Sequence, residues 1–363
     1  MSTVRFHPER LAVARARRRC TKVELAKRIG MSTRRVAAFE NEGAEPPRDT
    51  IERIAEALQF PVEFFLRPLP GGSLATESIS FRSFSRMAAR DRDAALAAFA
   101  LAAETAAWFD RQFHLPEPAL PDLRGVDPSA AATALRTSWE LGDGPAPNMV
   151  HLLEARGVRV FSLTHDCAAL DALSGWVGNV PYVFLSTHKS AERARWDAAH
   201  ELGHLLLHHH EPPRGRAHED EADAFAGEFL LPEGGLRPTI PRVISLQDVR
   251  HHKLTWRVSA MAWIRRAYQL DGLTEWSYRT LVIEASQAGL RSREDDIERE
   301  TSQLVPKVLE ILERESVALA DIARELALPT NELRDLLFQP STIDGDGQST
   351  PRPGRGSLRL ITG

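Results

Sequence analysis

Apolar residues recur at three- and four-residue spacing along most of the chain, which is the periodicity of helices that bury one face. Near the N-terminus, apolar clusters lie at residues 11–14, 25–29 and 36–39. Gly30 interrupts this pattern, and Ser32 stands where its hydroxyl can cap the next helix. The sequence therefore predicts a helix, a tight turn and a second helix in this region.

The residues that follow complete a small N-terminal unit. Residues 50–58 predict a further amphipathic helix, and the apolar and aromatic run at 60–65 would close its core. The run Pro-Leu-Pro-Gly-Gly-Ser at 68–73 is typical of a linker. We therefore expect a first domain over residues 1–67.

The next part of the chain, residues 68–147, predicts a linker and helical connector. Its expected elements, and those that lead out of it, are a strand or extended arm at 78–84, a long alanine-rich packing helix at 88–113, helices at 131–141 and 148–156, and a strand at 158–163. Helices therefore predominate before the middle of the chain, and the sheet is small.

Two helices with unusual polar residues are predicted downstream. Residues 195–208 are mostly apolar and of good helix propensity around the sequence His-Glu-Leu-Gly-His at 200–204. Residues 218–231 have core spacing and end at Pro232, which cannot continue a helix. The predicted fold class is mainly α with a small β-sheet, or α+β.

The C-terminal part divides into a helical and a polar segment. Residues 319–337 have the helix starts and breaks of a helix-turn-helix but lack a basic stripe. Their pattern therefore favours a role in packing or self-association. A Gly-, Pro- and Ser-rich composition follows, typical of a disordered tail. The expected units are a third domain at 148–290, a C-terminal helical region at 291–340 and the tail at 341–363.

The His-Glu-x-x-His spacing predicts a metal site. Positions four residues apart lie on one face of a helix, so His200 and His204 can offer ring nitrogens to one divalent ion. Glu201 follows the first histidine, where its carboxylate can reach a metal-bound water and act as general base. This arrangement indicates metal-dependent hydrolysis.

A catalytic zinc site usually has three protein ligands, and several side chains compete for the third position. His208 lies about 12 Å along the helix axis from the first histidine, too far to share its ion. His210 has the spacing of a third histidine, but the glycine that such a turn uses is absent. Glu219, on the polar stripe of the next helix, is the favoured ligand, with Asp223 one turn on to orient a ligating histidine. Glu221, which points elsewhere, remains an alternative together with His210.

The segment from about residue 175 to 290 resembles the ImmA/IrrE family of metallopeptidases. In that family a similar H-E-L-G-H helix precedes an E-x-x-x-(N/D)-x-F-A helix. The resemblance implies a gluzincin-like fold, one zinc ion held by His200, His204 and Glu219, and Glu201 as base. Family members carry Asn at the position of Asp223. The His/His/Glu set suits Zn²⁺, and Mn²⁺ is not excluded.

Two flanking segments fit the same resemblance. Residues 176–186 have the character of a strand and fall where the family places one, and such an edge strand would bind an extended peptide. Residues 253–267 are similar to the helical segment that follows the peptidase in many members. No oxyanion-stabilising residue can be assigned, and Tyr182 reads as a buried strand tyrosine.

The N-terminus is strongly basic, although the whole chain has a net charge of −4. Residues 1–35 hold eleven Lys and Arg against two Glu, which indicates a polyanionic partner. Residues 17–19, three consecutive arginines, have a simpler alternative as a solvated face.

Residues 9–66 resemble the Cro/repressor-type (XRE) helix-turn-helix domain. The resemblance implies that the helix beginning at Ser32 lies in the major groove of double-stranded DNA, with Thr33, Arg34 and Arg35 near base edges and Lys22 at a phosphate. A base-contacting Gln is common where Lys22 stands, so sequence-specific reading is weakened. The alternative is a helix-turn-helix kept for protein docking.

Composition limits where the protein acts. No stretch is long and apolar enough to cross a bilayer, and no apolar signal core follows the charged N-terminus. Cys20 and Cys167 lie in different predicted units, which fits reduced thiols better than a disulfide framework. We expect a cytoplasmic protein with no membrane partner.

Together these patterns predict a DNA-binding transcriptional regulator with a zinc-dependent endopeptidase domain. Its partners would be double-stranded DNA and a protein substrate, a repressor or antitoxin-like regulator, and a homodimer is compatible with the sequence. The main alternative is a transcription factor whose peptidase-like domain is a sensor or structural module without turnover. A third is a module that neutralises a neighbouring toxin.

Overall fold

The computed structural model describes residues 5–69, 88–163, 170–209, 215–291, 294 and 296–337. The predicted arm at 78–84, most of the linker at 68–73, His210, Cys167 and the tail at 341–363 lie outside the described residues. Helices predominate and accompany one small sheet, so the predicted fold class is confirmed. No helix in the described ranges is long and apolar enough to span a membrane.

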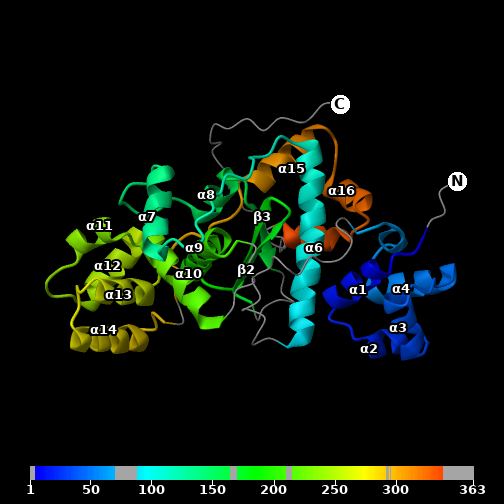
Figure 1. Cartoon of the computed structure of the whole chain (residues 1–363), viewed down its shortest axis with the longest axis horizontal. Helices are drawn as coiled ribbons and strands as arrows, with labels where there is room; N and C mark the ends of the chain where they lie inside the picture. The colour runs from blue at the N-terminus through cyan, green and yellow to red at the C-terminus, as the bar shows by residue number, and fades with distance from the viewer. Residues whose placement is uncertain are drawn as a thin grey trace, which may run out of the picture.

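The N-terminal unit consists of short helices around an apolar core (Figure 1). Its elements are α1 (Pro8–Arg17), α2 (Lys22–Arg28), α3 (Thr33–Asn41), α4 (Arg48–Leu58) and the 3₁₀-helix η1 (Val62–Leu66). Gly30 joins α2 to α3 with a φ of 65°, a left-handed conformation that favours glycine. The Ser32 side chain accepts a hydrogen bond from the Arg35 backbone N–H and caps α3. The predicted helix-turn-helix is therefore formed.

A long helix, α6 (Ala89–Gln112), stands between this unit and the sheet (Figure 1). The C-terminal helices α15 (Leu304–Arg314), α16 (Leu319–Glu325) and α17 (Thr330–Leu336) join the same hydrophobic core as α6 and the N-terminal helices. The helix-turn-helix-like segment at 319–337 therefore serves packing, one of the two roles expected for it.

Much of the N-terminal basic charge is used inside the molecule. Arg17 is only 1% exposed and pairs with Glu332 of α17, which also binds Arg18 at 2.7 Å. Arg10 is likewise buried and pairs with Glu104 of α6 at 2.6 Å. The reading of residues 17–19 as a solvated face is wrong for Arg17, because a carboxylate remote in sequence covers it. The surplus of positive charge in residues 1–35 therefore overstates the charge that remains available to bind a polyanion.

The sheet has three strands in the order β1-β3-β2. β1 (Arg159–Leu163) runs parallel to β3 (Val180–Ser186), and β2 (Ala172–Val177) runs antiparallel to it. The prediction of one edge strand over 176–186 is wrong, because Gly178 and Asn179 form a two-residue turn between Val177 and Val180. Most of that segment is the central strand, and β2 is an edge.

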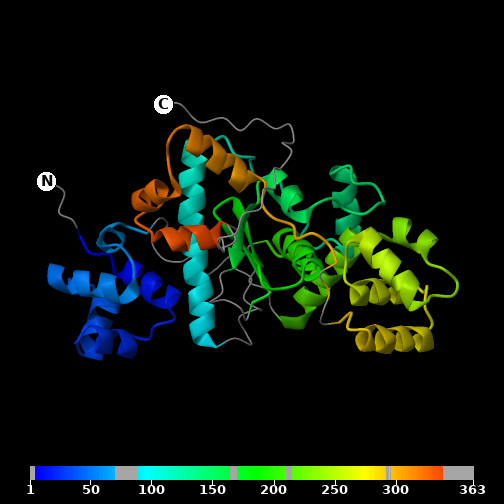
Figure 2. The same cartoon turned by 180° about the vertical axis from the view of Figure 1, so that it is seen from behind.

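Helices cover both faces of this sheet. α6 lies against the face that carries Tyr182 and Phe184, whereas α9 (Ala191–Leu207) lies against the other face, near β2. The helices that complete the unit around α9 are α7 (Pro128–Ser138), α8 (Met149–Ala155), α10 (Gly215–Leu230), α11 (Glu233–Leu236), α12 (Leu246–Trp256), α13 (Ala260–Gln269) and α14 (Glu275–Gln287), with the 3₁₀-helix η4 (Arg237–Thr239). The reverse view shows α11–α14 at the end of the molecule opposite the N-terminal unit (Figure 2).

Candidate metal centre and DNA-facing helix

The helix α9 carries both histidines of the His-Glu-x-x-His sequence. Its first turn is capped by Ser190, whose side chain accepts a hydrogen bond from the Arg193 backbone N–H, and its interior is mostly buried. The one-turn spacing brings the Nε2 atoms of His200 and His204 to 3.1 Å from each other. The local helix geometry alone thus places two nitrogens where they could ligate one metal ion.

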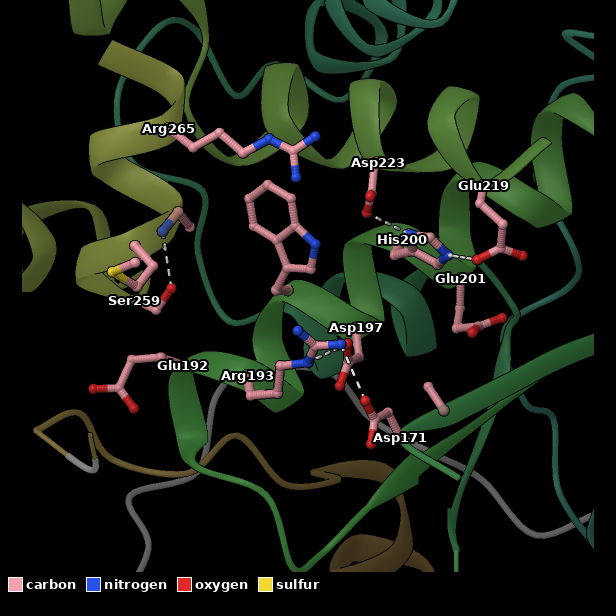
Figure 3. A pocket seen from close by; sticks show the side chains of 14 residues that line it. Asp171, Glu192, Arg193, Asp197, His200, Glu201, Glu219, Asp223, Ser259 and Arg265 are labelled. Atoms are coloured by element: carbon pink, nitrogen blue, oxygen red, sulfur yellow. Dashed lines mark hydrogen bonds and ion pairs between the residues drawn. The ribbon is translucent and has the colours of Figure 1, made fainter. Parts of the chain in front are cut away.

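The third group comes from α10, which packs closely on α9 at Gly203. A Cβ atom at Gly203 would lie 3.1 Å from the Phe225 ring and 3.3 Å from the Ala222 Cα, tighter than ordinary contacts. This close approach brings Glu219 to the histidines (Figure 3). Its carboxylate oxygens lie 3.5 Å from His200 Nε2 and 3.6 Å from His204 Nε2.

These separations fit a single metal ion. With zinc bonds of about 2.0–2.1 Å to N and O in tetrahedral geometry, two ligand atoms lie roughly 3.3 Å apart. The three measured separations, 3.1, 3.5 and 3.6 Å, bracket that value. Two imidazoles and one carboxylate also form a donor set that zinc accepts. His200, His204 and Glu219 are called the first group below.

Asp223 lies one turn beyond Glu219 and contacts the other nitrogen of His200. His200 Nδ1 is 3.0 Å from an Asp223 oxygen, so a proton on Nδ1 leaves the Nε2 lone pair facing Glu219 and His204. Burial is the largest single influence on Asp223 and raises its pKa, but the hydrogen bond and charge of His200, with smaller contributions from Arg265 and Trp196, together lower the pKa below its usual value. The carboxylate is therefore ionised when it orients the ring.

Glu201 is 4% exposed and lies beside the first group (Figure 3). The Ser174 hydroxyl of β2 donates a hydrogen bond to its carboxylate. Burial raises the Glu201 pKa, although His200 and Ser174 oppose the shift. A raised pKa suits a general base that must both take and return a proton near neutral pH.

A pocket of about 390 Å³ opens in front of these residues. Arg193 bridges Asp171 and Asp197 along one side of it, at 3.0 and 3.1 Å, and Arg265 of α13 lies on another side (Figure 3). Burial raises the Asp197 pKa to about 7 despite the Arg193 charge.

Neither Ser174 nor these charged residues of the pocket were among the site residues predicted from the sequence. Of these residues, only Ser174 could have been found from the sequence pattern. It is a small polar residue at the alternating strand position between Ala172 and Trp176, and these two residues pack in the same core as α9.

Other side chains considered from the sequence lie elsewhere. Tyr182 is buried on the α6 side of the sheet, where its ring stacks with Phe161 and lies tilted against Phe99, so it does not reach the pocket. Glu221 is not part of the first group and lies 2.7 Å from His208 Nε2.

The DNA-facing candidates lie at the start of α3 and on α2. Thr33, Arg34 and Arg35 are exposed there, next to the capping residue Ser32. Lys22 instead contacts Asn41 at 3.0 Å and Glu40 at 3.2 Å, so a phosphate contact would have to compete with these partners. The structure thus presents the two arginines more openly than the lysine.

Comparison with known proteins identifies two domains. Residues 153–268 match the family model of the IrrE N-terminal-like domain, and residues 11–65 match that of a helix-turn-helix. No curated protein matches the chain. The chain therefore combines a helix-turn-helix domain with an ImmA/IrrE-like peptidase domain, as the resemblance of its sequence indicated.

Proposed function

We propose that this protein is a DNA-binding transcriptional regulator that hydrolyses a peptide bond in a partner regulatory protein, a repressor or antitoxin-like regulator, inside the cytoplasm. The observation that carries the proposal is the convergence of His200, His204 and Glu219 beside the buried carboxylate Glu201, at a pocket. A structural metal site would not need a carboxylate in that position.

The residues divide the chemistry between them. His200, His204 and Glu219 would hold one Zn²⁺, which would polarise the scissile carbonyl and make a bound water more acidic. Glu201 would accept a proton from the attacking water molecule as the water oxygen bonds to the carbonyl carbon. When the carbon–nitrogen bond breaks, Glu201 returns the proton to the leaving amine. Ser174 holds the carboxylate in place throughout.

The edge strand β2 offers a place for an extended substrate. It pairs with β3 on one side, while Ala172 at its start lines the pocket together with Asp171. A peptide that adds to such an edge gains backbone hydrogen bonds, and its side chains fall alternately toward and away from the pocket. This geometry favours cleavage within an unfolded or exposed segment of a protein.

Metal analysis combined with mass spectrometry of new peptide ends tests the peptidase. Wild type and Glu201→Gln are incubated with lysate of the source cell, with Asp220→Asn, an exposed carboxylate on α10, as the control. We expect both variants to retain metal, and new ends to appear with wild type and Asp220→Asn alone. Equal cleavage by Glu201→Gln would overturn the mechanism. Bound metal without cleavage by any of the three proteins would favour the alternative, in which the peptidase-like domain is a sensor without turnover.

The DNA-binding half is tested by Arg34→Ala combined with Arg35→Ala. We expect duplex affinity to fall at least about tenfold. Metal content should stay unchanged, because α3, which carries both arginines, lies on the other side of α6 from α9 and α10 (Figure 1). Arg48→Ala, an exposed arginine of α4 with an 85% exposed side chain, is the control. Unchanged duplex affinity of the double variant would show that α3 does not lie in the major groove.

A further inference from the structure

A second set of two histidines and one glutamate lies beyond the first group. His208 caps the C-terminus of α9, directly after its last residue, and His218 and Glu221 come from the first half of α10. One ligand atom from each lies within 4.8 Å of the other two. His208 Nε2 is 2.7 Å from a Glu221 oxygen, and the rings of His208 and His218 stack with centroids 4.2 Å apart. These three residues are called the second group.

The surroundings of the second group leave room for an ion and its water. The group borders a hollow of about 370 Å³, which Arg124 to Pro128 and Leu207 also line. His208 has a side chain only 4% exposed, whereas that of Glu221 is 45% exposed. The buried His208 imidazole thus holds one side of the second group in place. The Glu221 carboxylate, at the surface, is able to move outward by the few tenths of an ångström that an ion requires.

We propose that His208, His218 and Glu221 form a second binding site for a divalent transition-metal ion, Zn²⁺ in the cell. The ligands repeat the donor chemistry of the first group, and water from the hollow completes the coordination. His218 and Glu221 are three residues apart and therefore lie on one face of α10. This site is independent of whether the protein cleaves peptides.

The two sites meet at one contact. His204 Nδ1 lies 2.9 Å from His208 Nδ1. If His204 binds the first ion through Nε2, its ring proton is on Nδ1 and points at His208. If His208 binds a second ion through Nε2, its own proton points back at His204. The two N–H groups then point at each other and cannot form a hydrogen bond. Binding of the second ion therefore removes the hydrogen bond between His204 and His208 and weakens binding of the first ion.

Titration of the metal-free full-length chain with Co²⁺, followed by visible absorbance and metal analysis, tests the site. We expect two equivalents for wild type, and one for His218→Ala and for Glu221→Gln. The controls are His251→Ala, an exposed histidine of α12, and Asp220→Asn, which should both keep two. Circular dichroism shows whether each variant is folded, and the surface variant Glu221→Gln remains informative if His218→Ala is not.

Two results would overturn the second site. One is a single equivalent for wild type, and the other is two equivalents for both His218→Ala and Glu221→Gln, which would place the extra ion elsewhere. The link between the sites has its own readout, since coupling is reciprocal. In His200→Ala the second ion should bind about tenfold more tightly than in wild type, because His204 is then able to shift its proton. Equal affinity would show that the sites are independent.

Discussion

The first and second groups have the same residue types but different environments. In the first, the two histidines lie one turn apart on a single helix and the glutamate comes from another, with separations of 3.1 to 3.6 Å. In the second, one histidine is the residue that caps the C-terminus of α9 and the other two ligands come from α10. The first group is already spaced for tetrahedral binding, whereas in the second His208 Nε2 and the Glu221 oxygen, 2.7 Å apart, must separate to admit an ion.

The neighbours differ more than the ligands do. The first group has Glu201 as a buried carboxylate, Asp223 to orient a ligand and a pocket beside the edge strand. Among the described residues that line the hollow of the second group, the one other carboxylate is Asp127, which caps α7 through the Ala130 backbone N–H. In the proposed sites, metal binding and catalysis are therefore separable, because catalysis needs a base and room for a substrate in addition to three ligands.

The largest effect should come from removing a ligand of the first group. His200→Ala is expected to lose the first ion and at least about a thousandfold in peptide cleavage, since both carbonyl polarisation and water activation depend on that ion. His218→Ala, which removes a ligand of the second group, should cleave as wild type does at low zinc. Metal analysis and peptide-end counting measure both. An equal loss of peptide cleavage in the two variants would show that the two groups do not differ in function.

A smaller effect is expected from the residue that orients His200. Asp223→Ala should weaken binding of the first ion by about ten- to a hundredfold, because His200 then loses the partner that fixes its proton on Nδ1. Competition with a chromophoric chelator measures this affinity. Asp220→Ala, with the same chemical change on the same helix, is the control. If both variants bind the first ion equally well, Asp223 does not position the ring.

The smallest effect concerns packing. Gly203→Ala should lower the free energy of unfolding by about 1–3 kcal/mol, because its Cβ would press on Phe225 and Ala222 where α10 approaches α9. Gly227→Ala is the matched control. Its Cβ would meet only Trp196 at 3.8 Å, and alanine favours a helix by up to about 1 kcal/mol over glycine. Urea unfolding distinguishes them, and equal stability would show that the crossing tolerates a methyl group.

The sequence predicted the parts of the fold that follow from local periodicity. The helix-turn-helix, the long helix α6, the pair α9 and α10 and the strand β1 all appear where apolar spacing and capping residues indicated them. The hairpin between β2 and β3 was missed, although Gly178-Asn179 is a turn sequence, because the β-branched residues on both sides read as one strand.

Sequence by itself determined the candidate ligand types, their one-turn spacing on α9 and the position of Glu201, because a helix converts spacing into geometry. It also favoured Glu219 and Asp223, but left Glu221 and His210 as alternatives, and only the tertiary structure decided which residues outside α9 lie beside the histidines. The crossing at Gly203 brought Glu219 to the first group, the sheet brought Ser174 to Glu201, and the end of α9 met His218 and Glu221. It also placed Glu332 on Arg17. These contacts join residues far apart along the chain or on separate elements, and no local period encodes them.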